Sequence, residues 1–233
     1  IVAHRFGFID KGFDDFFGLD NANTQLKFLY GVNDWLTVHI GRSGFQETYD
    51  LAAKYRMYSQ KENGFPVTIV GFNSVAINSE LKEEDYPNLK FENRLSYVAQ
   101  VLISRKFSDK LSLEIAPSVF HENTLRDILD ENNAVILPNP QDNTQFAVGL
   151  GGRYKLTSRW SVNVDYAAHL NRASQSNYKN PLSIGVDLET GGHVFQMHFT
   201  NAQAMHETGY LGQTVGDWSK GEIAFGFNLV RVF

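Results

Sequence analysis

The chain has no cysteine and no apolar run long enough to form a transmembrane helix. Without cysteine there is neither a disulfide framework nor thiolate chemistry. A spanning helix needs about 20 consecutive, mostly apolar residues, whereas the 42% hydrophobic content of this chain is dispersed among polar residues. The net charge of −5 and the pI near 5.8 argue against nucleic acid as a partner, because surfaces that bind nucleic acid are basic.

What the sequence does have is apolar and polar residues that alternate with a period of two. Residues 144–156 and 160–170 alternate almost throughout and are separated by three residues. Successive side chains of a β-strand point to opposite faces, so this pattern predicts an antiparallel hairpin. Both segments are longer than the usual strand of roughly 5 to 6 residues and match the roughly 9 to 11 residues of a bilayer-crossing strand. Arg153 and Lys155 lie opposite the apolar face, which favours lipid on one side and a polar lumen on the other.

The same alternation divides the whole chain into about twelve strands. The predicted strands are residues 1–8, 24–32, 36–42, 47–59, 66–78, 91–107, 111–120, 144–156, 160–170, 181–189, 193–201 and 222–233. Short and long connections alternate, with one exception near residue 44, as is typical of outer-membrane barrels with short periplasmic turns. We therefore predict a single domain, residues 1–233. The fold class is all-β: a closed antiparallel transmembrane β-barrel with both termini periplasmic.

Aromatic residues gather beside the predicted short turns, where amphipathic rings meet the membrane boundary. They are Tyr30, Trp35, Phe65, Phe107, Tyr154, Trp160 and Phe233. The alternative is a soluble barrel or sandwich that buries its alternating apolar face in a core. Strand length, the asymmetry of the connections and these aromatics together favour the membrane barrel.

The last strand resembles the closing strand of bacterial outer-membrane proteins. Ile223, Phe225, Phe227 and Leu229 alternate before a terminal Phe233, although Arg231 interrupts the pattern. In that class the final aromatic is read by the barrel-insertion machinery, so the resemblance implies this machinery as a partner.

Longer stretches, among them YGVNDWLTVHIGR, ETGGHVFQMHFTNAQAM and GDWSKGEIAFGFNLVRVF, resemble an uncharacterised family of Bacteroidota outer-membrane β-barrel proteins, a domain of unknown function. The resemblance implies an outer-membrane location and carries no activity. Since Ile1 does not begin a signal peptide, we expect an export signal that is removed or not included.

The inward faces of the predicted strands carry nearly balanced charge, whereas a strongly selective pore shows a ring of one sign. Lys54 and Arg56 lie about half-way round the barrel from Asp187 and Glu189, each pair a few residues from a short turn. We predict a charged lumen constriction formed by these four residues. The other predicted lumen-lining residues are Arg94, Glu114, Arg153, Asp165, His169 and His198. A lattice of salt bridges without a transport role is the alternative.

Catalytic and metal sites are weakly indicated. His198-Phe199-Thr200-Asn201 resembles the His-x-Ser-Asn run of the outer-membrane phospholipase, but threonine replaces serine and no orienting asparagine follows at the family's spacing. His193 and His198 differ in parity and face opposite sides of a regular strand, which disfavours a metal site with His206. We predict no catalytic residue, no metal and no cofactor.

These observations lead to two functional hypotheses. The first is a narrow, non-enzymatic pore for small polar or charged solutes. The second is a structural or scaffolding barrel with a closed lumen that docks a periplasmic or surface partner as part of an outer-membrane complex. Phe13, Phe16, Phe17 and Trp218 suit such docking and equally suit a plug at the barrel mouth. Outer-membrane lipid is an expected partner in both cases, and nucleic acid in neither.

Overall fold

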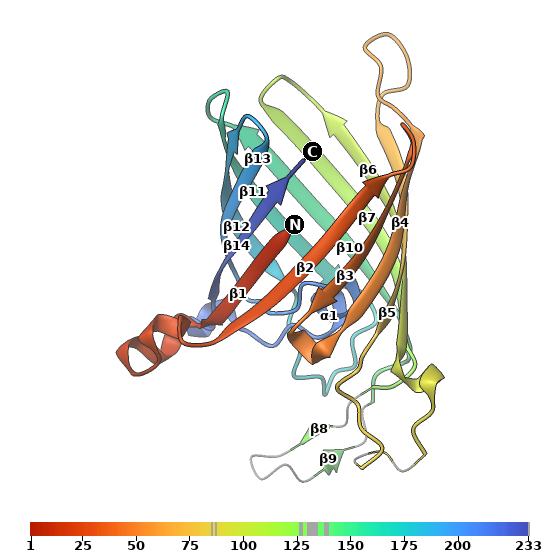
Figure 1. Ribbon diagram of the computed structural model, residues 1–233, viewed down its shortest axis with the longest axis vertical. Coiled ribbons are helices and arrows are strands. Elements are labelled where there is room, and N and C mark those ends of the chain that lie inside the picture. The colour runs from red at the N-terminus through yellow and green to blue at the C-terminus, as the bar shows by residue number, and fades with distance from the viewer. Residues whose placement is uncertain (85, 87, 126–127, 130–134, 138–139, 233) are drawn as a thin grey trace.

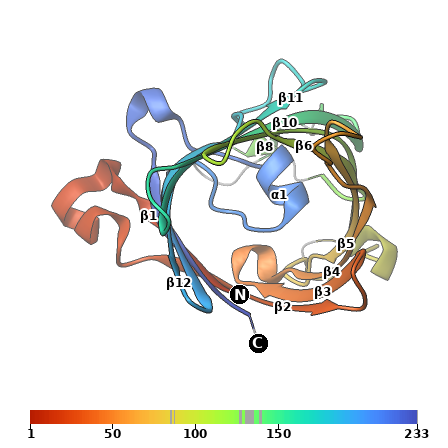
Figure 2. The ribbon, with the colours of Figure 1, turned by 90° about the horizontal axis from the view of Figure 1, so that it is seen from above.

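The computed structural model describes residues 1–84, 86, 88–125, 128–129, 135–137 and 140–232. In this part of the chain, twelve strands close into one antiparallel barrel (Figures 1 and 2). They are β1 (Val2–Phe8), β2 (Ala22–Gly31), β3 (Leu36–Ser43), β4 (Tyr49–Tyr58), β5 (Thr68–Ile77), β6 (Leu95–Lys106), β7 (Leu111–Glu122), β10 (Thr144–Lys155), β11 (Trp160–His169), β12 (Leu182–Thr190), β13 (His193–Thr200) and β14 (Ala224–Arg231). The predicted closed antiparallel barrel of about twelve strands is confirmed.

Each barrel strand pairs with its sequence neighbours, and β1 closes the ring on β14. In the β10–β11 hairpin, Arg153 lies opposite Asn163 and Gly151 opposite Asp165. The long connection between β7 and β10 contains a separate small sheet of β8 (Ile128–Leu129) and β9 (Val135–Leu137). Short helical segments occupy other connections: η1 (Ile9–Gly18), η2 (Phe45–Glu47), η3 (Phe91–Arg94), α1 (Glu207–Gly212) and η4 (Trp218–Lys220).

The outer wall is apolar and exposed, as the alternation predicts. Phe28, Ile40 and Leu150 are large outward side chains that remain open on the surface. The aromatics predicted beside the short turns are exposed as well, apart from Phe233, which lies outside the described residues. An apolar band flanked by aromatic side chains is the surface that a barrel presents to lipid.

The two ends of the barrel differ. The hairpins that link β2 to β3, β4 to β5, β6 to β7, β10 to β11 and β12 to β13 turn at one end, the short-turn end, where both termini lie (Figure 1). The long connections and the helical segments lie at the opposite, long-loop end. Within the described residues, no helix has the length and apolar character that crossing a bilayer requires.

Two connections at the long-loop end lie on opposite sides of the barrel wall, one inside and one outside. Residues 202–221, here termed the lumen loop, fold back so that α1 lies inside the ring of strands (Figure 2). By contrast, η1 projects outward from the wall, so Phe13, Phe16 and Phe17 do not plug the mouth (Figures 1 and 2). The last loop therefore enters the barrel, whereas the aromatic first connection does not.

Candidate functional site

The lumen loop is anchored by an apolar cluster inside the barrel. Leu211 of α1 is buried against inward side chains of four neighbouring strands. They are Val98 of β6, Phe120 of β7, Ala147 of β10 and Ala167 of β11. Burying one leucine contributes roughly 2 kcal/mol, so this contact favours the loop inside the lumen over a hydrated one.

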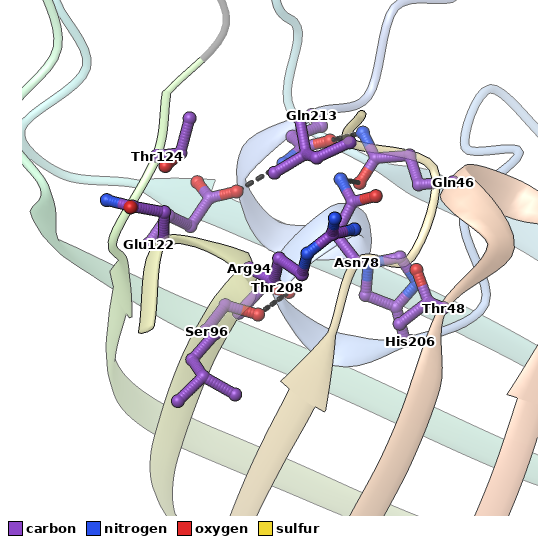
Figure 3. A pocket seen from close by; sticks show the side chains of 13 residues that line it. Gln46, Thr48, Asn78, Arg94, Ser96, Glu122, Thr124, His206, Thr208 and Gln213 are labelled. Carbon is purple, nitrogen blue, oxygen red and sulfur yellow. Dashed lines mark hydrogen bonds between the residues drawn. The ribbon is translucent and has the colours of Figure 1, made fainter. Parts of the chain in front are cut away.

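Hydrogen bonds join the same loop to the wall and to η2 (Figure 3). Thr208 Oγ1 lies 3.2 Å from Ser96 Oγ of β6. Gln213 donates to Glu122 of β7 and accepts from Gln46 of η2. Glu122 is itself buried and accepts from Gln145 of β10 at 2.9 Å. Both carboxylate oxygens of Glu122 thus have a donor, as a buried polar group requires.

A charged cluster reaches the loop from the other side of the barrel. Asp50 of β4 is only 3% exposed and lies 2.6 Å from His39 Nε2 of β3. Lys27 of β2 lies 3.8 Å from Asp50 and 3.5 Å from Glu207 of α1. A buried charge is tolerated when it is paired and hydrogen-bonded, so Lys27 ties the start of α1 to the wall.

His206, directly before α1, is buried among these groups. Its ring packs against Phe45 of η2 at a centroid distance of 5.8 Å, and its Nδ1 is buried without a hydrogen-bond partner. Burial lowers the His206 pKa to about 4, while the nearby carboxylates of Glu207 and Asp50 oppose the shift. The imidazole is therefore neutral at pH 7 while the loop is in the lumen.

Little space remains between the lumen loop and the wall. A cavity of about 30 Å³ lies among Gln46, Arg94, Thr208 and neighbouring residues (Figure 3). A second one, beside Gly212 and Glu122, has about 10 Å³. A site for one water molecule needs roughly 10 to 15 Å³ on a comparable measure, so these gaps are no larger than a few water molecules.

The wall between β11 and β1 borders a larger, polar cavity of about 310 Å³. Its polar side chains are Arg5, Asn163, Asp165, Ser183, Asp187, Gln196, His198 and Asn228. A hydrogen-bonded row runs across these strands: Arg5 donates to Asn228 at 3.1 Å, Asn228 to Gln196 at 3.0 Å, and Gln196 to Asp187 at 3.1 Å. The row presents charged and amide groups to the lumen.

On β4 and β10, inward side chains become more exposed toward the short-turn end. On β4, Asp50 and Ala52 are buried, whereas Lys54 and Arg56 are exposed. On β10, Gln145 is buried near the loop and Lys155 is exposed at the far end. Solvent thus enters the lumen from the short-turn end, and the lumen loop closes most of the other.

The family model of the membrane-bound beta-barrel domain (DUF5777) matches residues 1–233. The chain belongs to this family. As predicted, the family is a domain of unknown function, here with a membrane-bound barrel fold over the whole chain. A comparison with curated protein sequences finds no match.

Solved porin structures share the fold of this DUF5777 barrel. The NanC porin aligns with a TM-score of 0.60 at 10% identity over 100% of both chains. The KdgM porin aligns with a TM-score of 0.59 at 7% identity, covering 100% of this chain and 98% of that one. A second KdgM structure, described as a complex with disordered oligogalacturonate, aligns with a TM-score of 0.57 at 7% identity and the same coverage.

Three of the four predicted constriction residues, Arg56, Asp187 and Glu189, have hydrogen-bond or ion-pair partners in the structure. Arg153 of β10 pairs with Glu189 and lies 3.8 Å from Asp187, so both carboxylates have a cation on their own side of the barrel. Arg56 donates to the carbonyl of Asp34 at 2.6 Å. Among the described residues, no ion pair joins Lys54 or Arg56 to Asp187 or Glu189. A constriction formed by these four stays a prediction.

The predicted lumen-lining residues occupy several levels of the DUF5777 barrel. Asp165 accepts from Tyr210 of α1, and His169 Nε2 lies 2.8 Å from Gln145. Arg94 belongs to η3 and not to a strand; it donates to the Ser79 carbonyl at 3.4 Å beside the smaller cavity. Glu114 and Arg153 are inward residues of β7 and β10, and His198 borders the larger cavity.

The residues considered for lipid hydrolysis are not joined. Thr200 Oγ1 accepts from Ser183 at 2.8 Å and from the Ala202 amide at 3.1 Å. His198 Nε2 is buried without a partner. Across the part of the chain with described coordinates, no group of three or more histidine, aspartate or glutamate side chains is placed to hold a metal ion.

The lumen loop was not predicted as part of the site, apart from Trp218, which was predicted to suit either docking or a plug. One signal for it exists: residues 202–221 carry only Glu207, Asp217 and Lys220 as charged residues, whereas residues 80–90 are dense in charge. A long connection with few charges and several small or apolar residues is one that a barrel interior can accept.

Proposed function

We propose that this barrel is a narrow, non-enzymatic outer-membrane pore for small polar or charged solutes, and that the lumen loop is its constriction. The observation that carries the proposal is the hydrated, charge-lined lumen that runs from the short-turn end to a loop packed inside the barrel. The shared fold with the NanC and KdgM porins supports it.

The contacts of the loop favour a constriction that can move. Besides the apolar contacts of Leu211 and the packing of His206 on Phe45, the contacts named above are hydrogen bonds and the Lys27–Glu207 ion pair. A hydrogen bond exchanged with water contributes only about 0.5 to 1.5 kcal/mol net. Water that enters from the short-turn end can replace these bonds one at a time.

The second candidate is a closed structural barrel that docks a partner in an outer-membrane complex. The small size of the gaps beside α1 favours it, because they pass nothing larger than water while the loop is packed. The two functions differ in whether solutes pass the loop.

Single-channel recording of the refolded protein in a planar bilayer separates the two candidates. A pore should show small, steady openings. Arg56→Ala or Asp187→Ala should change the size or the ion selectivity of these openings, because both residues are inward residues near the short-turn end. A silent bilayer, with folding demonstrated by heat-modifiable gel migration, would contradict the pore and favour the closed barrel.

Acid should loosen the lumen loop. A hydrated histidine has a pKa of 6.5, against about 4 for His206 in its buried place. Between these values the released loop binds a proton that the packed loop does not, so packing weakens as the pH falls. At a pH of about 5 the loss is roughly 2 kcal/mol. From pH 7 to 5 the open fraction in recordings should rise more in the wild type than in His206→Gln, because only the wild type has this histidine. An equal rise in both proteins would contradict the role of His206.

A further inference from the structure

The segment η1 is the most exposed apolar feature outside the barrel wall. Phe13 is 84% exposed, Phe16 56% and Phe17 42%. The rings of Phe13 and Phe17 pack only edge to face on each other, at a centroid distance of 4.9 Å. Proteins seldom leave such a group of large apolar side chains in water unless it meets a partner or a membrane.

The base of η1 is built to hold a fixed position. Gly18 has a positive φ of 81°, and a Cβ there would lie 2.3 Å from the Gly7 carbonyl oxygen of β1. The Ile9 amide donates to the Ile223 carbonyl at 2.9 Å, next to the start of β14, and the Gly7 amide donates to the Asn21 carbonyl at 3.0 Å. Close backbone approach and two hydrogen bonds thus attach the segment firmly to β1 and the edge of β14.

The second half of η1 has an unfavourable backbone conformation. Phe16 and Phe17 are consecutive non-glycine residues with φ of 43° and 56°. L side chains rarely adopt this left-handed region, and such strain concentrates at functional positions. The conformation places three phenylalanine rings on one projecting turn without burying any of them in the protein.

The position of η1 is continuous with the lipid-facing wall. It follows β1 directly and projects outward from the rim, roughly across the barrel axis (Figures 1 and 2). A row of outward aromatics lies next to its base: Phe6 stacks on Phe225 at 5.9 Å, and Phe225 contacts Phe199 at 5.7 Å. The plane into which η1 extends is therefore the boundary of the membrane in which the barrel lies.

We propose that η1 is an interfacial membrane anchor, whose Phe13, Phe16 and Phe17 insert among the lipid headgroups and upper acyl chains beside the barrel. Aromatic rings are favoured at this depth, and short amphipathic segments bury their apolar face there. The side chains of Asp10 and Asp14 are exposed and can stay in water while the rings enter the lipid. The anchor fixes the depth and tilt of the β1–β14 side of the barrel.

The absence of native cysteine allows a direct test with single spin labels. Phe13→Cys and Phe17→Cys are labelled with a nitroxide in phosphatidylcholine vesicles, and collision rates with oxygen and with a water-soluble nickel complex are compared. Asp14→Cys is the matched control on the same turn, and Phe28→Cys on the outer wall marks the lipid phase. An anchor gives an oxygen-to-nickel ratio at 13 and 17 that is several-fold higher than at 14 and close to that at 28.

A second experiment tests whether the label itself draws position 13 into lipid. In a Phe16→Ser, Phe17→Ser background, the label at position 13 should move toward the aqueous ratio, because the remaining rings no longer hold the turn in lipid. Ratios at 13 and 17 that equal the ratio at 14 would overturn the proposal, and would identify η1 as a surface for a protein partner. Each labelled variant is first checked for folding by heat-modifiable migration.

Discussion

Replacing residues 203–220 by a short glycine–serine linker should raise the single-channel conductance several-fold. Thr200 and Ala224 already face each other as partners in the β13–β14 ladder, so a tight connection between these strands is sterically feasible. The replacement removes α1 and leaves the polar lumen without an internal loop. Since the gaps beside α1 are about 30 and 10 Å³ and the cavity along the wall about 310 Å³, the loop is the narrowest part of the path.

A graded variant serves as the control for this deletion. Leu211→Ala keeps the loop and its hydrogen bonds but removes its apolar anchor, and a buried Leu→Ala change costs about 2 to 5 kcal/mol. It should increase the fraction of time spent open and leave the size of the fully open level unchanged. A folded deletion variant that stays silent would show that the lumen is closed elsewhere, and would favour the scaffolding barrel.

The wall of this barrel was predictable because its pattern is local. Each strand shows its own alternation of apolar and polar residues. Because lipid lies outside and a polar lumen inside, each side chain faces one of only two environments. Whether Asp165 or Arg153 faces the lumen or the lipid therefore follows from a few neighbours in sequence. The same reasoning predicts the antiparallel order, because consecutive strands joined by short turns pair with each other.

The contents of the lumen were not predictable in this way. Gln46 and Gln213 lie far apart in sequence, and their hydrogen bond exists only because two connections meet inside a closed ring. The helix α1, Glu207–Gly212, is too short to show a period of 3.6 residues. Periodicity has no information about which loop enters a barrel, so Trp218 of the last loop was predicted to suit either docking or a plug, and α1 was not predicted.

The constriction prediction rests on counting residues from a turn, which gives a height in the barrel but not the contacts of a side chain. It placed Asp187 and Glu189 at the height of Lys54 and Arg56, on the opposite wall. A long arginine side chain finds partners on adjacent strands first: Arg153 donates to Ser161 of β11 at 2.9 Å and reaches the carboxylates of β12 beyond it. These contacts run along one wall of the barrel. Counting residues from a turn does not identify which neighbouring side chains will pair.

Locking α1 to the wall should suppress permeation if the lumen loop has to move. Ser96 Oγ and Thr208 Oγ1 are 3.2 Å apart, one on β6 and one on α1, and a disulfide needs side chains that already approach each other closely. In the double variant Ser96→Cys, Thr208→Cys, no native cysteine competes for the bond. The oxidised barrel should show severalfold fewer or smaller openings than the wild type, and a reductant should restore them.

The single variants Ser96→Cys and Thr208→Cys control for the loss of the hydroxyl contact, and should respond to neither oxidant nor reductant. The lock also separates two ways in which the deletion could increase conductance. If solutes pass through openings made when α1 leaves the wall, oxidation closes the pore, since Thr208 is held at Ser96. If solutes pass between a stationary loop and the far wall, conductance is the same in both redox states, and the loop acts as a fixed filter whose gaps set the size limit.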